Sequence, residues 1–310
     1  MIGARVLVTG GTGLIGRHAV DALASAGAEV HILSRSVATE GPRLGAIYYH
    51  ACNLLDKVEI GAMFKAISPS HFLHLAWETE HGRFWQAPEN LDWVAVTCNL
   101  ARAFVEAGGR RIVGAGTCAE YDWKWPGLEA GGCDEFTTPL APHFLYGRAK
   151  RACFDVIGSF AKSEGVEFAW GRVFLLFDPE EHHQRLVASI FYSLLSGKTA
   201  ACSVGTQLRD FLPAREVGRA FAAIAKSSVL GPINIGSGEP RTIADVATAI
   251  GNLVGRPDLV ALGTLPTRPD DPPRLTPAVS RLQREVGFSV EDGMDMALTK
   301  YWNALLAKVA

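Results

Sequence analysis

The sequence of 310 residues lacks the marks of several large classes of protein. Its six cysteines form no C-x-x-C pair and no short metal-ligand spacing, so we predict reduced thiols and no metal site. No apolar run approaches the roughly 18 residues of a membrane span. We find no internal repeat and no low-complexity tract. The net charge of −2 gives no general attraction to nucleic acid or to anionic membranes.

Very little sequence precedes the first strand-like run, which leaves no room for a signal peptide. We therefore expect a cytoplasmic protein that binds a small molecule, and neither nucleic acid nor a membrane. Because the overall charge is close to zero, a phosphorylated ligand would have to be bound by local groups.

Strand-like runs alternate with segments of helical spacing along the first 175 residues. We predict strands at 6–8, 29–33, 46–49, 71–75, 111–115 and 167–173, and helices at 13–26, 56–67, 88–107 and 142–163. This alternation predicts an α/β fold with a Rossmann-type doubly wound parallel sheet. The pattern loosens after residue 175, where we expect a smaller C-terminal α/β substrate-binding domain. The expected boundaries are 1–174 plus roughly 214–238 for the dinucleotide-binding domain, and 175–213 with 239–310 for the substrate-binding domain.

A glycine-rich loop follows the first predicted strand and precedes the first predicted helix. Residues 9–16 read T-G-G-T-G-L-I-G, with Gly10, Gly13 and Gly16 at intervals of three. Glycine permits backbone conformations closed to other residues, and its missing side chain lets a diphosphate approach the helix N-terminus. The loop therefore predicts a dinucleotide site.

Tyr146 and Lys150 lie four residues apart and share one face of the predicted helix 142–163. Tyrosine, with an ordinary pKa of about 10, is a poor base at neutral pH. A neighbouring ammonium favours the phenolate, so this spacing suits proton transfer.

These features together resemble the extended branch of the short-chain dehydrogenase/reductase family. Arg209-Asp210-Phe211, Asn234–Gly238 and Arg268-Pro269-x-Asp271 are similar to further motifs of that family. The resemblance implies a dinucleotide held by these residues: Gly10, Thr12, Gly13, Leu14, Ile15, Ser34, Arg35, Asn53, Leu54, Leu75, Ala76, Trp77, Tyr146, Lys150 and Phe174. Asn53 replaces the usual aspartate, Trp77 is bulkier than usual, and Trp93 stands where many members have asparagine. We expect Trp93 to be a packing residue.

The end of the second strand bears on the choice of cofactor. Folds that prefer NAD place an acidic residue there, but here the strand ends Leu33-Ser34-Arg35-Ser36. An arginine suits a 2′-phosphate by charge and forked geometry. We therefore expect NADP, with NAD as the alternative.

The segment after the strand at 111–115 is similar to the family segment that carries the third catalytic hydroxyl. When Tyr121 is aligned with the tyrosine of that family segment, the catalytic hydroxyl corresponds to Thr117. Thr117 would bind the substrate oxygen beside Tyr146, and Tyr121 would lie in the wall of the site. Cys118 and Ala119 occupy the positions of the Asp-Glu pair of 4,6-dehydratases, so a dehydratase is disfavoured.

The resemblance also implies that Arg209 and Arg268 bind the diphosphate of a nucleotide sugar, although internal salt bridges with neighbouring carboxylates would explain them equally. We expect an NADP-dependent oxidoreductase that reduces a keto group of a nucleotide-activated deoxysugar, with Tyr146 as proton donor. The alternatives are an NAD-dependent nucleotide-sugar 4-epimerase and a non-catalytic dinucleotide-binding sensor.

The resemblance further implies a homodimer formed by helices 88–107 and 142–163. Its apolar face would consist of Cys98, Leu100, Phe104, Phe154, Ile157 and Phe160. The same residues could instead pack on the sheet of their own chain.

Overall fold

A computed structural model describes residues 1–35, 46–268 and 270–309 of the chain. Within these residues, seven strands form one parallel sheet in the order β11-β6-β5-β4-β1-β2-β3. The strands are β1 (Arg5–Thr9), β2 (Glu29–Ser34), β3 (Ile47–Ala51), β4 (His71–His74), β5 (Arg111–Thr117), β6 (Glu167–Val173) and β11 (Gly231–Ile235). The predicted Rossmann-type fold is confirmed.

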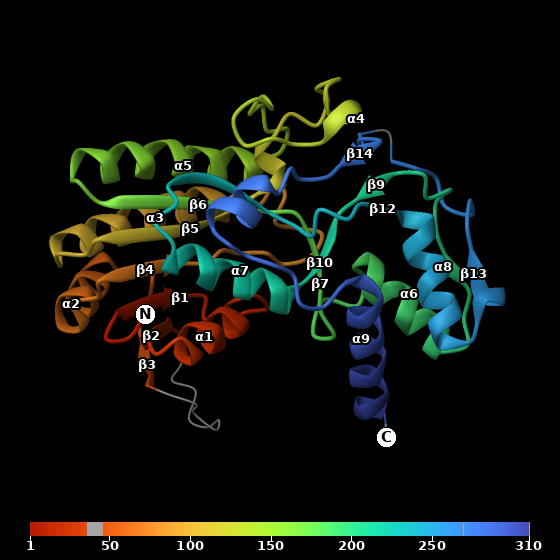
Figure 1. Cartoon of the computed structure of the whole chain (residues 1–310), viewed down its shortest axis with the longest axis horizontal. Helices are drawn as coiled ribbons and strands as arrows, with labels where there is room; N and C mark the ends of the chain where they lie inside the picture. The colour runs from red at the N-terminus through yellow and green to blue at the C-terminus, as the bar shows by residue number, and fades with distance from the viewer. Residues whose placement is uncertain (36–45, 269, 310) are drawn as a thin grey trace.

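Helices cover both faces of this sheet (Figure 1). On one face lie α1 (Gly16–Ser25) and α7 (Ala214–Lys226), which pack on each other; on the other lie α2 (Lys57–Ile67), α3 (Glu89–Glu106) and α5 (Leu145–Ser163). The Asp56 side chain caps α2 by accepting hydrogen bonds from the N–H groups of Val58 and Glu59 at 2.8 and 3.3 Å, as its position in the sequence predicts. Helix α1 begins later than expected, because residues 13–15 belong to the preceding turn.

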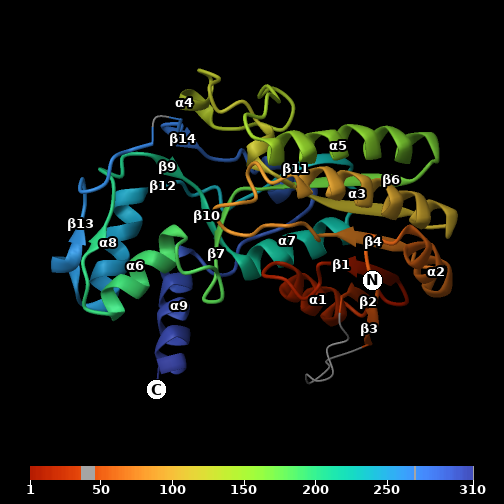
Figure 2. The ribbon, with the colours of Figure 1, turned by 180° about the vertical axis from the view of Figure 1, so that it is seen from behind.

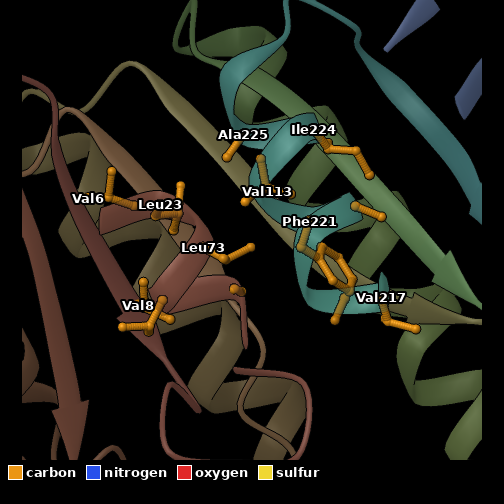
Figure 3. Packing of buried hydrophobic residues seen from close by; sticks show 14 of the residues in the cluster. Val6, Val8, Leu23, Leu73, Val113, Val217, Phe221, Ile224 and Ala225 are labelled. Carbon is orange, nitrogen blue, oxygen red and sulfur yellow. The ribbon is translucent and has the colours of Figure 1, made fainter. Parts of the chain in front are cut away.

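The core between the sheet and α1/α7 is a set of interdigitated aliphatic side chains around Phe221 (Figure 3). Val6, Val8, Leu73 and Val113 rise from β1, β4 and β5 toward the helices, and each is no more than 1% exposed. Fully burying one such side chain stabilises the fold by about 1.5–3 kcal/mol. This packing fixes the strand order, and with it the place where strand ends meet.

The apolar face that we predicted for a dimer is only partly available. Leu100, Phe104 and Ile157 are at most 2% exposed and pack against the sheet in the core of their own chain. Cys98, Phe154 and Phe160 are partly buried against the same cluster. For Leu100, Phe104 and Ile157 the alternative that we left open is the one observed, because α3 and α5 use these residues to cover β4, β5 and β6.

The remaining elements gather at one end of the molecule, beside the sheet, in both views of the ribbon (Figure 2). Phe177, Phe191, Ile250 and Tyr301 are among the residues that fill a separate core there. These elements include α6 (Leu186–Leu195), α8 (Ile243–Val254) and α9 (Met294–Val309), with the short strands β7 (Leu175–Phe177), β8 (Ala200–Ala201), β9 (Leu208–Arg209), β10 (Phe211–Pro213), β12 (Arg241–Thr242), β13 (Val260–Ala261) and β14 (Arg274–Leu275). Helix α4 (Leu128–Gly131) contacts β14.

From β1 the chain adds β2 and β3 on one side of the sheet, and from β4 it adds β5, β6 and β11 on the other side. The strand order therefore reverses between the neighbours β1 and β4. In doubly wound sheets, ligands bind in the crevice outside the carboxyl ends of the strands at this point. Among the described residues, no helix is long and apolar enough to cross a membrane.

Candidate active site

The glycine loop packs directly against the end of β4. Gly10 has φ +72°, and a Cβ added to it would lie 2.6 Å from the backbone nitrogen of Ala76. A Cβ on Gly16 would lie 1.9 Å from the Gly10 carbonyl oxygen, while the Gly13 N–H donates to that oxygen at 3.0 Å. The loop is therefore a tight turn without room for side chains on its inner side, as the predicted diphosphate cradle requires.

The first helix begins at this turn, where the Arg17 N–H donates to the Gly13 carbonyl at 3.1 Å. Ile15, the residue before α1, makes no side-chain capping hydrogen bond. The N–H groups and the helix dipole at such an N-terminus attract anions. The residues present thus fit a dinucleotide diphosphate.

Residues 30–35, at the end of β2, include no carboxylate. Arg35 is exposed, and residues 36–45 lie outside the described part of the chain. Asn53, which we predicted to contact the dinucleotide, is exposed after β3, where its Oδ1 accepts a hydrogen bond from the Leu55 N–H at 3.1 Å. This bond shapes the turn into α2 and leaves the Asn53 amide nitrogen as a donor.

Three predicted catalytic side chains come from the end of β5 and the first turns of α5. The Thr117 side chain lies near the Tyr146 phenol, and its Oγ1 accepts a hydrogen bond from the Ala119 N–H at 3.2 Å. Burial raises the pKa of Tyr146 above its ordinary value, while the neighbouring Thr117 side chain and the charge of Arg185 act in the opposite direction. Lys150 donates from Nζ to the Ala115 carbonyl at 2.8 Å, and burial lowers its pKa to about 8.

Aromatic side chains surround the phenol of Tyr146. The Phe84 ring centroid lies 4.9 Å from that of Tyr146, the Trp85 centroid 5.9 Å and the Trp77 centroid 6.3 Å, all close to edge-to-face. The Tyr146 N–H also donates to the Trp85 carbonyl at 3.0 Å. The segment between β4 and α3 therefore closes over the start of α5.

A buried ion pair lies beneath Thr117, and our sequence analysis missed it. Glu120 and Arg172 are both fully buried, with 2.8 Å between Oε2 and Nε. Glu120 Oε1 accepts from the Thr117 N–H and from Trp170 Nε1, both at 2.9 Å. An arginine inside an otherwise apolar central strand was the signal, because a buried charge needs a partner.

Tyr121 belongs to the same buried network. It is 1% exposed, its hydroxyl donates to Asn234 Oδ1 at 2.7 Å, and that hydroxyl accepts from Arg172 Nη1 at 3.2 Å. The structure thus places Tyr121 in the core beneath the strand end, and not on the open wall we expected. Phe174 is likewise buried, with its ring centroid 6.2 Å from that of Tyr121.

The two predicted substrate arginines have different surroundings. Arg209 is buried and pairs with Asp271, with 2.5 Å between Nη2 and Oδ1, and it also donates to the Leu208 carbonyl at 2.8 Å. Burial raises the pKa of Cys118 to about 12, and the charge of Arg209 opposes this rise, which places Arg209 within electrostatic reach of the site. Arg268 is exposed; burial lowers the pKa of His81, and the charge of Arg268 adds to this effect.

Arg185 is a second feature that the sequence analysis did not single out as a site residue. It directly precedes α6, and its Nε lies 3.1 Å from Oε2 of the buried Glu181. Nearby, the ring of His182 stacks on that of His81 with 4.9 Å between centroids. Since the Arg185 charge acts on Tyr146, this cation lies near the candidate catalytic phenol.

Residues 6–236 match the model of the NAD dependent epimerase/dehydratase family. The chain is 23% identical over 303 residues to UDP-glucuronic acid decarboxylase 1 of Xenopus tropicalis, a match that covers 95% of this chain and 71% of that protein. Its fold is similar to UDP-N-acetylglucosamine 4-epimerase of Methanobrevibacter ruminantium M1 in complex with UDP-N-acetylmuramic acid (TM-score 0.85, 22% identity, 99% and 100% of the two chains). It is also similar to the UDP-glucose 4-epimerase of Thermus thermophilus in complex with NAD (TM-score 0.80, 24% identity, 96% of this chain and 98% of that chain).

Proposed function

The chain belongs to the NAD dependent epimerase/dehydratase family, and we propose that within it this protein is an NADP-dependent oxidoreductase that reduces a keto group of a nucleotide-activated deoxysugar. The observation that carries the proposal is that the Thr117 side chain lies near the Tyr146 phenol, with Lys150 one helical turn away, at the carboxyl ends of the central strands.

The glycine turn supports the cofactor part of the proposal. Gly10, Gly13 and Gly16 allow the tight turn that brings the loop backbone to the N-terminus of α1 and against the end of β4, where a diphosphate would bind. Arg35 supports NADP, because an exposed guanidinium pairs with a 2′-phosphate and would gain nothing from an unmodified ribose. The other residues assigned to this ligand by resemblance remain proposals.

The bound dinucleotide would supply the hydride, and the side chains of this chain would manage the proton. Tyr146 donates its phenolic proton to the oxygen that becomes the alcohol. Thr117 hydrogen-bonds the same oxygen and shares the developing charge. Lys150 stabilises the phenolate left on Tyr146 by its positive charge.

Basic side chains support a substrate with a diphosphate. Exposed Arg268 can bind a phosphate directly, whereas Arg209 would have to share its guanidinium with Asp271. The substrate-binding part would consist of residues 175–213 and 239–310, and the dinucleotide-binding part of 1–174 with roughly 214–238. The solved neighbours named above carry nucleotide sugars or NAD in their own names, which supports this class of substrate.

A 4-epimerase that uses NAD is the alternative, favoured by the epimerases of similar fold. It would use Thr117, Tyr146 and Lys150 in the same way. The difference lies in the cofactor, which an epimerase retains and a reductase consumes.

Fluorescence titration with NADPH and NADH, for the wild type and Arg35→Asp, separates these functions. We expect NADPH to bind more tightly, with at least tenfold weaker binding in the variant. Stronger binding of NADH or NAD, or cofactor retained through purification, would favour the epimerase. Binding of a dinucleotide without turnover of any 4-keto sugar nucleotide would leave the non-catalytic sensor.

We further propose a homodimer through the outer faces of α3 and α5. The support is that Leu91 on α3 and Val156 on α5 are 62% and 52% exposed on two helices that pack side by side. Light scattering of the wild type and Val156→Glu tests this: we expect a dimer that the variant converts to monomer, and a monomeric wild type would refute it.

A further inference from the structure

Trp77 contacts two of the candidate catalytic side chains, the ammonium of Lys150 and the phenol ring of Tyr146. The Lys150 Nζ lies 3.8 Å from the centroid of the Trp77 ring, over its face. The same ring meets Tyr146 nearly edge-to-face, with 6.3 Å between centroids and an interplanar angle of 72°. A cation within about 6 Å of an indole face is attracted by the ring quadrupole.

The Trp77 ring is held in this position from two further sides. Its Nε1 donates to Oδ1 of Asn90 at 2.9 Å, and the Asn90 amide nitrogen donates to the carbonyls of Phe84 and Ala87, each at 2.8 Å. Trp93 stacks on Trp77 with 5.9 Å between centroids and an interplanar angle of 29°. The buried Asn90 therefore connects the ring to the segment that closes over Tyr146.

Lys150 has few other partners. It is 3% exposed and donates one hydrogen bond, to the Ala115 carbonyl. The titratable groups that act on its ammonium are Cys153 on the same helix and Glu120 after β5, both of which favour the charged form. His74 on β4 also lies within electrostatic range, and burial keeps it neutral with a pKa lowered to about 3.

We propose that Trp77, backed by Trp93, is a positioning residue that holds the Lys150 ammonium charged and in place beside Tyr146. This inference rests on the proposed function, in which Lys150 acts on the Tyr146 phenolate. Because little water reaches Lys150, the ring face replaces part of the solvation that the ammonium loses on burial. Trp77, which we predicted to contact the dinucleotide, and Trp93, which we expected only to pack, thus both serve the catalytic lysine.

The test is a pH titration of Lys150 by NMR of lysine-selectively ¹³C-labelled protein without substrate or cofactor. The Lys150 signal is assigned by its absence in Lys150→Arg. In Trp77→Leu we expect the pKa of Lys150 to fall by about 0.5–1 unit, since the attraction that favours the ammonium is removed. In Trp77→Phe, which keeps a smaller ring face, we expect about half that shift.

Trp302→Leu is the matched control, because Trp302 is also half-buried and stacks on an aromatic ring, that of Phe191, but lies on α9. It should leave the Lys150 titration unchanged. An unchanged or raised pKa of Lys150 in either folded Trp77 variant would overturn the inference.

Kinetics supply the second readout. The alkaline fall of kcat/KM should move to lower pH in Trp77→Leu by the same amount as the NMR titration, and not in Trp302→Leu. The NMR titration needs no turnover, so an inactive wild type would count against the proposed function alone, while an unshifted Lys150 would count against the role of Trp77 alone.

Discussion

Replacing Glu120 with glutamine should destabilise the protein far more than the loss of an ordinary salt bridge. Both Glu120 and Arg172 are fully buried, and the carboxylate accepts hydrogen bonds from three donors. Glutamine keeps one acceptor oxygen but turns an NH₂ group toward a donor, and it leaves the Arg172 charge without its partner. Breaking a buried ion pair on one side costs about 3–5 kcal/mol.

The measurement is urea unfolding followed by circular dichroism, with the free energy of unfolding extrapolated to water. Glu285→Gln is the control, because Glu285 pairs with Arg281 at 2.9 Å but is half-exposed, and such pairs contribute about 0–1 kcal/mol. The double variant Glu120→Gln/Arg172→Met removes the unpaired charge and should be more stable than Glu120→Gln alone. The reasoning fails if Glu120→Gln costs no more than Glu285→Gln, or if the double variant loses the sum of both single losses.

Three further outcomes are expected. Tyr146→Phe should lower kcat by about 10²- to 10⁴-fold with little change in the dissociation constant for NADPH, since it removes only the proton donor; equal activity in a stopped-flow assay would contradict this. Gly10→Ala should abolish binding of the dinucleotide, because the new methyl group would overlap the backbone of Ala76 at φ +72°; calorimetric titration checks it. Burial lowers the pKa of His74 to about 3, so below pH 6.5 the unfolded chain takes up a proton that the folded protein does not. Stability should fall as the pH drops from about 6.5 toward 3, by up to about 1.4 kcal/mol per pH unit, and His74→Gln should show a flatter dependence in chemical unfolding at pH 7 and pH 5.

The sheet could be predicted from the sequence because its signals are local. Short apolar runs, the glycine turn and the Asp56 cap each act within a few residues of themselves, and the strands and helices they predict are present. The start of α1 was misplaced by three residues, since the glycine turn and a helix both continue the same apolar spacing. Parallel pairing follows from the alternation itself, whereas the strand order is known only from the structure.

Residues of the site could be predicted to lie together only where they belong to the same helix or strand. Tyr146 and Lys150 share a helix, so their spacing placed them together, but Glu120 and Arg172 lie 52 residues apart and meet only through the order of β5 and β6. Trp77 likewise follows β4 and meets Lys150 of α5, which is distant in the sequence, only in the folded chain. The burial of Tyr121 depends on its hydrogen bond with Arg172, which no local sequence pattern predicts.

The most direct test of the proposed function is isotope transfer. The protein would be incubated with NADPH deuterated at nicotinamide C4 and a 4-keto-6-deoxy sugar nucleotide, and the products analysed by absorbance at 340 nm and mass spectrometry. The account predicts that NADPH is consumed in equal amount to the product and that one deuterium appears on the sugar ring, with neither change in Tyr146→Phe. Interconversion of 4-hydroxy sugar nucleotides without consumption of NADPH, supported by NAD alone, would contradict it.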